Sequence, residues 1–388
     1  MKTLLIGNGF DLYHNFPTKY ANFLNVTNFL LSQYSNEMKT VGHVLGAQGL
    51  HALDKDIARN YSIHKEIFDT TPLNDENITC LIEKGRTNLW FRFLTNYINA
   101  QSGWIDFEKE IGRVISAFSK IPTDLVYSNI IPLSDYLAYE DFHMICQFGV
   151  FEAIGPFNVS TTEKYFSERT PGTNIKVLNI DSITSTLFEA LQELAGMLQA
   201  YLNCFVEASL LTMCNVRCLP LHQNFADADI VVTFNYTNTY EQLYKTESRI
   251  FHIHGRVNDS IILGINPDEH DELAELDTTF VQFKKYYQRV YLQTDVDYIK
   301  FKTGMQTNAK YNPSRELEII GHSLDITDKD IIVDMFQLAT TIKIYCHNHS
   351  AIGSYIRNLI AIFGKNGFDS IRESKQLEFV LLNNMVWN

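Results

Sequence analysis

Strand-like segments occur near both ends of this chain of 388 residues and are almost absent between them. The first is residues 2–6, which stop at a Gly-Asn-Gly turn and are followed by a helical pattern from residue 17 to about 35. The others lie at residues 230–234, 250–254, 261–263, 317–320 and 341–345. Each is apolar nearly throughout, which is typical of strands covered on both faces of a parallel sheet. We therefore expect the two ends of the chain to assemble one parallel sheet.

The residues between these strands have helical patterns. Aromatic-rich amphipathic stretches lie near residues 38–60, 76–99, 106–119 and 182–212. Apolar strands that alternate with helices predict an α/β fold, here Rossmann-like and interrupted by a large, mainly helical insertion. The expected boundaries are a discontinuous α/β domain at residues 1–35 and 217–388, and a helical insertion at residues 36–216.

The composition excludes several classes of protein. Apolar residues make up 45% of the chain and charged residues 20%, with 19 glycines and 9 prolines, which excludes collagen-like and largely disordered chains. The net charge of −13 argues against non-specific nucleic-acid binding. We find no signal peptide and no apolar run of about eighteen residues, so we expect no membrane association. Six cysteines without framework spacing fit a reducing compartment, and we expect a cytoplasmic protein.

Four short motifs fall at the carboxyl ends of expected strands, where parallel α/β sheets bind ligands. They are Gly7-Asn8-Gly9-Phe10-Asp11, Thr233-Phe234-Asn235-Tyr236, His254-Gly255 and Gly321-His322-Ser323-Leu324. The Asn235 amide suits a water or a substrate carbonyl, although Asn also favours turns for backbone reasons. The His254 imidazole titrates near neutral pH when unperturbed, which suits a general base. Taken singly, each motif also has a purely structural interpretation.

Two familiar enzyme motifs fit these residues poorly. Leu12 stands where the dehydrogenase fingerprint has its third glycine, and no acidic strand end follows about twenty residues later. Asp325 stands where a nucleophile elbow around Ser323 requires glycine. The sequence therefore disfavours a Rossmann dehydrogenase and a serine hydrolase.

Other polar features allow structural or functional interpretations. Asp106 and Glu108 open a helix, where they suit the N-cap and the positive end of the dipole. Residues 266–277 carry six carboxylates and no Lys or Arg, which indicates a solvated loop or helix start. Metal ligation is weakly indicated, and no metal is expected; the side chains considered are His252, His254, His347, His349, Cys214 and Cys218.

The order and spacing of the motifs resemble the AbiH family of bacteriophage abortive-infection proteins. The similar segments are Gly7-Asn8-Gly9-Phe10-Asp11, Phe16-Pro17, Thr233-Phe234-Asn235-Tyr236-Thr237 with Tyr240-Glu241, Ile253-His254-Gly255 and Gly321-His322-Ser323-Leu324, together with the helix opening at Trp104, Asp106 and Glu108. The resemblance runs from Met1 to about His349 and is thinnest in the helical block. It implies a phage-defence effector.

A more distant similarity is to the sirtuin-like NAD-binding fold. Gly7-Asn8-Gly9 with Asn15-Phe16-Pro17 resembles the sirtuin Gly-Ala-Gly and Gly-Ile-Pro segments, and the Asn235, His254 and Gly321 motifs resemble Gln-Asn-Ile-Asp, His-Gly and Gly-Thr-Ser. This similarity implies a sirtuin-type sheet with NAD as substrate or ligand. The implied nucleotide-binding residues are Gly7, Asn8, Gly9, Phe10, Thr233, Gly255, Gly321 and Ser323.

Departures from the sirtuin pattern narrow the implied chemistry. Asp11 replaces a small hydroxyl residue, Thr237 replaces a carboxylate that contacts nicotinamide, and the zinc ribbon is absent. These departures disfavour a protein deacetylase and leave hydrolysis of NAD at the nicotinamide–ribose bond, with Asn235, His254 and Asp11 as catalytic candidates.

Two alternatives stay open. One is a nucleotide-sensing or protein-interaction module without chemistry. The other is a metal-dependent nuclease or hydrolase that uses His252, His254 and Asp11. The expected partners are a nucleotide and a phage-derived activator or partner protein, and a homo-oligomer is compatible with the sequence.

Overall fold

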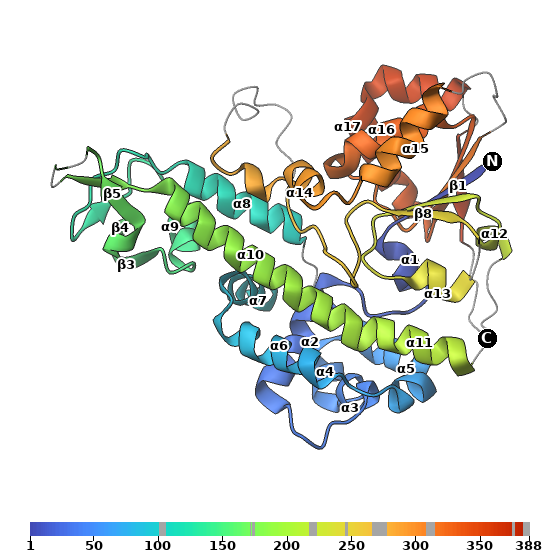
Figure 1. Ribbon diagram of the computed structural model, residues 1–388, viewed down its shortest axis with the longest axis horizontal. Coiled ribbons are helices and arrows are strands. Elements are labelled where there is room, and N and C mark those ends of the chain that lie inside the picture. The colour runs from blue at the N-terminus through green and yellow to red at the C-terminus, as the bar shows by residue number, and fades with distance from the viewer. Residues whose placement is uncertain are drawn as a thin grey trace.

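A six-stranded parallel sheet forms the centre of the α/β part of the molecule (Figure 1). The computed structural model describes residues 1–100, 106–170, 172, 175–216, 223–244, 247–265, 278–307, 315–374 and 377–382. The strand order is β11-β10-β9-β1-β7-β8. The strands are β1 (Lys2–Ile6), β7 (Ile230–Thr233), β8 (Arg249–His252), β9 (Glu316–Ile320), β10 (Thr341–Cys346) and β11 (Leu377–Leu381). The predicted α/β parallel sheet is confirmed.

The register of the sheet brings the carboxyl ends of four strands level. Ile6 at the end of β1 pairs with Thr233 of β7 on one side and with Ile320 of β9 on the other. Thr233 in turn pairs with His252 of β8. Because parallel strands end at the same edge, the residues that follow these four strands meet there even though they are far apart in sequence.

Alternate residues of the strands face two different layers, as the pleat requires. Leu5, Val232 and Ile319 face a core shared with α16 (Lys329–Leu338), α17 (His349–Ser374) and Tyr298 of α15 (Val296–Thr307). Leu4 and Val231 belong to a larger core that includes α1 (Asn8–Tyr13), α13 (Thr239–Tyr244) and the helical block. Figure 1 shows these two helical layers on opposite faces of the sheet.

The helical block follows β1 and α1 directly. Its helices are α2 (Tyr20–Gln33), α3 (Val41–Leu45), α4 (Gln48–Leu53), α5 (Lys55–Thr70), α6 (Asp75–Thr87), α7 (Leu89–Ala100), α8 (Phe107–Ser119), α9 (Tyr139–Cys146), α10 (Ile180–Leu202) and α11 (Ala208–Val216). The core of this block is continuous with the core under the sheet. The boundary at residues 36–216 therefore stays a prediction.

One long helical run crosses the whole molecule. A π-helical segment, Asn203–Glu207, joins α10 to α11, and the run is long and apolar enough to cross a membrane. However, 72% of its most apolar window is buried inside the protein, as in a core helix. Its N-cap is Asn179, whose side chain accepts a hydrogen bond from the Ser182 backbone N–H.

Several strands differ from the prediction. The insertion contains two small antiparallel sheets, formed by β2 (Ile131–Pro132), β3 (Phe151–Gly155) and β4 (Asn158–Thr161), and by β5 (Phe166–Glu168) and β6 (Lys176–Leu178). These strands are short and mostly half-buried or exposed, so they lack the apolar runs that marked the strands of the large sheet. Residues 261–263 are not a strand of the large sheet, because Ile261 makes only an isolated bridge to Gly255. The edge strand β11 was not predicted.

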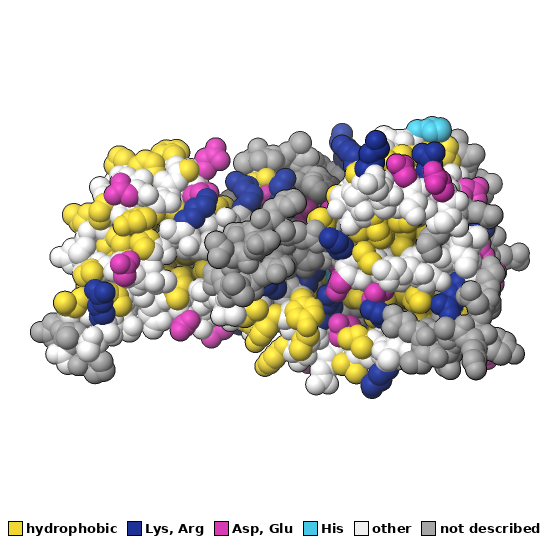
Figure 2. Space-filling view, turned by 90° about the horizontal axis from the view of Figure 1, so that it is seen from above, with side chains coloured by type: hydrophobic (Ala, Val, Ile, Leu, Met, Phe, Trp, Pro, Cys, Tyr) yellow, Lys and Arg dark blue, Asp and Glu magenta, His cyan; other side chains and the backbone are white. Residues whose placement is uncertain are grey.

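The lobe that carries the small sheets exposes apolar side chains, which form the patches at the left of Figure 2. The large apolar residues that this lobe exposes are Val126, Ile130, Tyr136, Tyr139, Ile154 and Ile175.

The remaining described helices are α12 (Gln223–Ala226) and α14 (Lys285–Leu292). The acidic segment at residues 266–277 lies outside the described residues, so its prediction is not tested.

Candidate functional site

A pocket of about 1130 Å³ lies at the carboxyl edge of the sheet, between the strand ends and the helical block. Seven of the residues proposed from the sequence line it: Gly7, Asn8, Asp11, Asn235, His254, Gly321 and Ser323. They come from the ends of β1, β7, β8 and β9, while α2, α8 and α10 supply the facing wall. Segments more than two hundred residues apart thus meet at one cavity.

The other four proposed residues lie behind the pocket wall. Phe10 is fully buried and packs on Phe225 and Tyr240. The Thr233 hydroxyl accepts a hydrogen bond from the backbone N–H of Asn235 at 3.0 Å. Gly9 and Gly255 do not line the cavity among the described residues. Their direct contact with a nucleotide stays a prediction.

Glycine is required where two of the motif loops touch. Gly321 has a φ of +70°, a conformation that favours glycine, and a Cβ at this position would lie 2.1 Å from the Phe10 nitrogen. The Gly9 amide N–H donates to the Gly321 carbonyl at 2.8 Å. These glycines therefore bring the β1 and β9 loops together, which gives the N-terminal motif a structural reason for its composition.

Asp11 is buried beneath the pocket floor with a satisfied and an unsatisfied oxygen. Its Oδ2 accepts a hydrogen bond from the Thr237 hydroxyl at 2.6 Å. Its Oδ1 has no hydrogen-bonding partner among the described residues. Burial raises the pKa of Asp11 to about 7, against the opposing effect of hydrogen bonds from Thr237 and Thr239. This carboxyl can therefore gain or lose a proton near neutral pH.

Asn235 presents its amide to the pocket beside Asp11. The residue is 5% exposed, and neither its Oδ1 nor its Nδ2 makes a hydrogen bond of ordinary geometry with a described residue. The amide still lies close enough to Asp11 to lower the pKa of that carboxyl. An unsatisfied buried amide is costly, so a pair of such atoms at a pocket wall indicates a site for a polar ligand.

His254 is held by a buried carboxylate. Its Nε2 lies 3.0 Å from Oδ1 of Asp328, while Oδ2 of Asp328 lies 3.4 Å from Nε2 of His322. The Nδ1 of His322 accepts from the Leu324 amide, so its proton is on Nε2 and points to Asp328. Burial lowers the pKa of His254 to about 4, with the Lys285 charge acting in the same direction. His254 is therefore neutral at pH 7.

A cation links the sheet edge to the helical block. The Lys285 ammonium lies 2.8 Å from Glu108 Oε2 and 3.3 Å from Asp328 Oδ1. Burial alone would lower the pKa of Lys285, but these two carboxylates outweigh burial and raise it. Burial raises the pKa of Glu108 to about 7, although Lys285 opposes this. Lys285 thus stays charged and ties α8 to the loop before α16.

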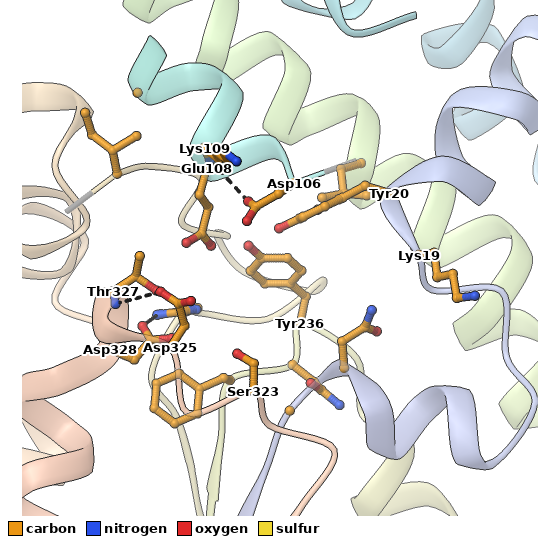
Figure 3. Close-up of a pocket in the computed structure, with 18 of the residues that line it drawn as sticks. Lys19, Tyr20, Asp106, Glu108, Lys109, Tyr236, Ser323, Asp325, Thr327 and Asp328 are labelled. Atoms are coloured by element: carbon orange, nitrogen blue, oxygen red, sulfur yellow. Dashed lines mark hydrogen bonds and ion pairs between the residues drawn. The ribbon is translucent and has the colours of Figure 1, made fainter. Parts of the chain in front are cut away.

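Two tyrosines complete the wall near Glu108, as Figure 3 shows. The Tyr236 hydroxyl donates to the Ile262 carbonyl at 2.7 Å, and Tyr20 stacks on Phe107 with the ring centres 4.1 Å apart. Their rings give the pocket an aromatic surface between its polar groups. A flat, apolar ligand group can pack there.

The sequence did not identify Tyr20, Tyr236, Lys285 and Asp328 as site residues. Asp328 lies four residues after the motif that ends at Leu324, and Lys285 lies in no motif, so the sequence gave no sign that either charge is buried. Asp106 is the N-cap of α8, as predicted, since its side chain accepts from the Lys109 amide. Glu108, interpreted only as a helix-start residue, faces the pocket.

The candidate metal residues that the structure describes do not converge, and Cys218 lies outside the described residues. His252 Nε2 lies 2.6 Å from Glu241 Oε1, and His347 and His349 are exposed just after the end of β10. No group of three or more His, Cys, Asp or Glu side chains is arranged to hold a metal ion within the described part of the chain.

The fold and the pocket define an α/β protein with a polar ligand site at the carboxyl edge of a parallel sheet, enclosed by a helical block. The chain matches the family model "Bacteriophage abortive infection AbiH" over residues 3–346 and belongs to that family. Membership supports a role in phage abortive infection. No curated protein and no solved structure matches the chain significantly, so the sirtuin similarity rests on the motifs alone.

Proposed function

We propose that this protein is an abortive-infection effector that hydrolyses NAD at the bond between nicotinamide and ribose. The bond electrons leave with the nicotinamide nitrogen, which becomes neutral, and the ribose carbon becomes oxocarbenium-like. Water adds to that carbon and gives up one proton. The products are nicotinamide, ADP-ribose and a proton, so atoms and charge balance.

The observation that carries the proposal is the Asn235 amide, buried at the pocket wall with both polar atoms unsatisfied. A carboxamide such as that of nicotinamide offers one donor and one acceptor, which matches the Asn235 acceptor and donor. His254 lines the same cavity and is neutral, as a group that accepts the proton of the incoming water must be.

The contact between Asp11 and Thr237 supports the comparison with sirtuin motifs. In those motifs a small hydroxyl residue follows the glycine turn and a carboxylate follows the asparagine. Here the carboxylate follows the glycine turn and the hydroxyl follows the asparagine, and the two side chains are 2.6 Å apart. The same pair of groups is therefore available beside Asn235 with its members exchanged.

The size of the cavity also supports a ligand as large as a dinucleotide. Pockets for small ligands usually measure about 300–1,000 Å³, and this pocket measures about 1130 Å³.

The test measures nicotinamide release from NAD by chromatography, with purified protein alone and with an extract of phage-infected cells as a source of activator. We expect Asn235→Ala and His254→Ala each to lower turnover by about 10²–10⁴. His347→Ala is the matched control, because this histidine is exposed and does not line the pocket. Activity that survives in both site variants would show that the assignment is wrong.

The low pKa of His254, about 4, favours a second candidate, because so weak a base suits binding without chemistry. This candidate is a nucleotide-sensing module. It predicts that NAD and ADP-ribose raise the melting temperature progressively as the ligand concentration increases, while nicotinamide is never released.

A further inference from the structure

We propose that Glu108, supplied by the helical block, binds the hydroxyl groups of the ligand ribose that faces His254. This inference deepens the proposed function and rests on it. It assigns to the insertion a direct part in choosing the substrate, namely a ribonucleotide with free sugar hydroxyls.

Glu108 is held at the pocket wall by its place in a capped helix and by Lys285. It stands in the first turn of α8, whose N-terminus is held by the Asp106 cap. Its side chain is 22% exposed and lines the cavity, and its Oε2 is bound to Lys285 at 2.8 Å. Figure 3 shows the carboxylate directed into the cavity toward the side of Asp328. The Oε1 atom has no hydrogen-bonding partner among the described residues.

A chain of short contacts connects Glu108 to His254. Glu108 is bound to Lys285, Lys285 lies 3.3 Å from Asp328, and the same Asp328 oxygen lies 3.0 Å from His254. Glu108 and His254 therefore flank the same end of the pocket. A sugar whose reacting carbon faces His254 brings its hydroxyl groups to Glu108.

The chemistry of a carboxylate fits this partner. An ionised carboxylate only accepts hydrogen bonds, and vicinal ribose hydroxyls offer two donors. Dinucleotide-binding folds usually take this carboxylate from a strand end. Here β7 pairs beside β1 and is followed by Phe234 and Asn235, with no carboxylate. The helical block supplies the missing acceptor from the opposite wall.

Among the charged groups around Glu108, Lys285 is the one that favours its ionised form, against the effect of burial. Lys285 is positive and in contact, whereas Asp328 and Asp106 act on it as negative neighbours. Lys285 is shared between Glu108 and Asp328. Because ribose is neutral, its hydroxyl groups can donate hydrogen bonds to Glu108 without adding charge to this cluster. A phosphate at this place would instead face the carboxyl groups of Glu108, Asp328 and Asp106 with Lys285 as the cation in contact, so repulsion disfavours it.

The experiment compares binding of NAD with binding of an NAD analogue that lacks the 2′-hydroxyl on the nicotinamide ribose, by titration calorimetry. For the unaltered protein we expect the analogue to bind at least about ten-fold more weakly, as for a lost hydrogen bond to a charged group. We expect Glu108→Gln to bind NAD about ten-fold more weakly and to lose most of the preference between the two ligands. Glu110→Gln, on the same helix but outside the pocket and paired with Arg113, is the matched control.

Each outcome decides a separate point. A Glu108→Gln protein that keeps the full preference would overturn the assignment of Glu108 while leaving the nucleotide site intact. If Glu108→Gln does not fold, as judged by its melting curve, Glu108→Ala replaces it, and an unchanged preference there has the same meaning because alanine offers no hydrogen-bond acceptor. Failure of the unaltered protein to bind NAD, with or without the infected-cell extract, would overturn the proposed function and this assignment with it.

Discussion

Replacing Asp11 with asparagine tests whether the buried carboxyl at the pocket floor has the environment that the structure gives it. Asparagine keeps the size of the side chain and can still accept the Thr237 hydrogen bond through its own oxygen. It removes the proton equilibrium. The change therefore isolates the cost of ionising a carboxyl at a site that is 1% exposed.

The magnitude follows from the pKa of Asp11, which burial raises from its ordinary 3.8 to about 7. At pH 8 the carboxyl is ionised in both states, and its ionisation costs the folded state about 4 kcal/mol. At pH 5 it is protonated in the folded state and mostly ionised in the unfolded state, and the cost falls to about 1.5 kcal/mol. Between these pH values the folded state binds more protons, so this group makes stability fall as pH rises toward 7.

Urea unfolding followed by tryptophan fluorescence measures the free energy of unfolding at pH 5, 6.5 and 8. We expect Asp11→Asn to gain stability relative to the unaltered protein as pH rises, by about 2–3 kcal/mol between pH 5 and pH 8. Asp297→Asn is the control, because the Asp297 side chain is 79% exposed and solvated in both states. A difference between Asp11→Asn and the unaltered protein that stays constant across these pH values would refute the argument.

Two further predictions concern the framework of the site. Gly321→Ala should lower the free energy of unfolding by more than about 1 kcal/mol, because the new Cβ would lie 2.1 Å from the Phe10 backbone at a residue whose φ is +70°. Thermal unfolding of this variant measures the loss. Gly304→Ala is the control, because a Cβ there meets nothing within 4 Å. Lys285→Met should destabilise the protein by about 3–5 kcal/mol at pH 8, because it leaves two carboxylates without their buried cation. The destabilisation should be smaller at pH 5. An equal loss of unfolding free energy at both pH values would contradict this prediction.

The parallel sheet was predictable because its strands carry their own signal. Residues 2–6 and 230–233 are apolar on both faces, and only a sheet covered on both sides buries such strands. The edge strand β11 is half-exposed, so its pattern is weaker. The short strands of the insertion are held by the hairpins and by Leu133 and Val159 in the core, which are contacts that no local pattern encodes.

The candidate site was predictable only where a residue follows a strand. Asn235 and His254 each stand two positions beyond the end of their strand, β7 and β8, and the shared edge of a parallel sheet brings them together. Glu108 and Tyr20 lie on helices whose packing is set by the tertiary fold. Their sequence patterns fit a solvent-facing helix start as well as a pocket-lining one. Only the structure distinguishes these two positions.

The distribution of unsatisfied polar atoms argues that this edge is built for a ligand. Within the described residues some of these atoms lie singly away from this pocket, for example in Thr27, Tyr298 and Arg315, while Thr18 and His254 each contribute one at the pocket wall. Asp11 and Asn235 together leave three, and these are adjacent, comprise both a donor and acceptors, and border the pocket. Each costs about 1–3 kcal/mol while unsatisfied, and this cost is recovered when a partner arrives. A fold under selection for stability alone would remove such a group, so its presence is explained best by a polar ligand whose own donor and acceptor complete it.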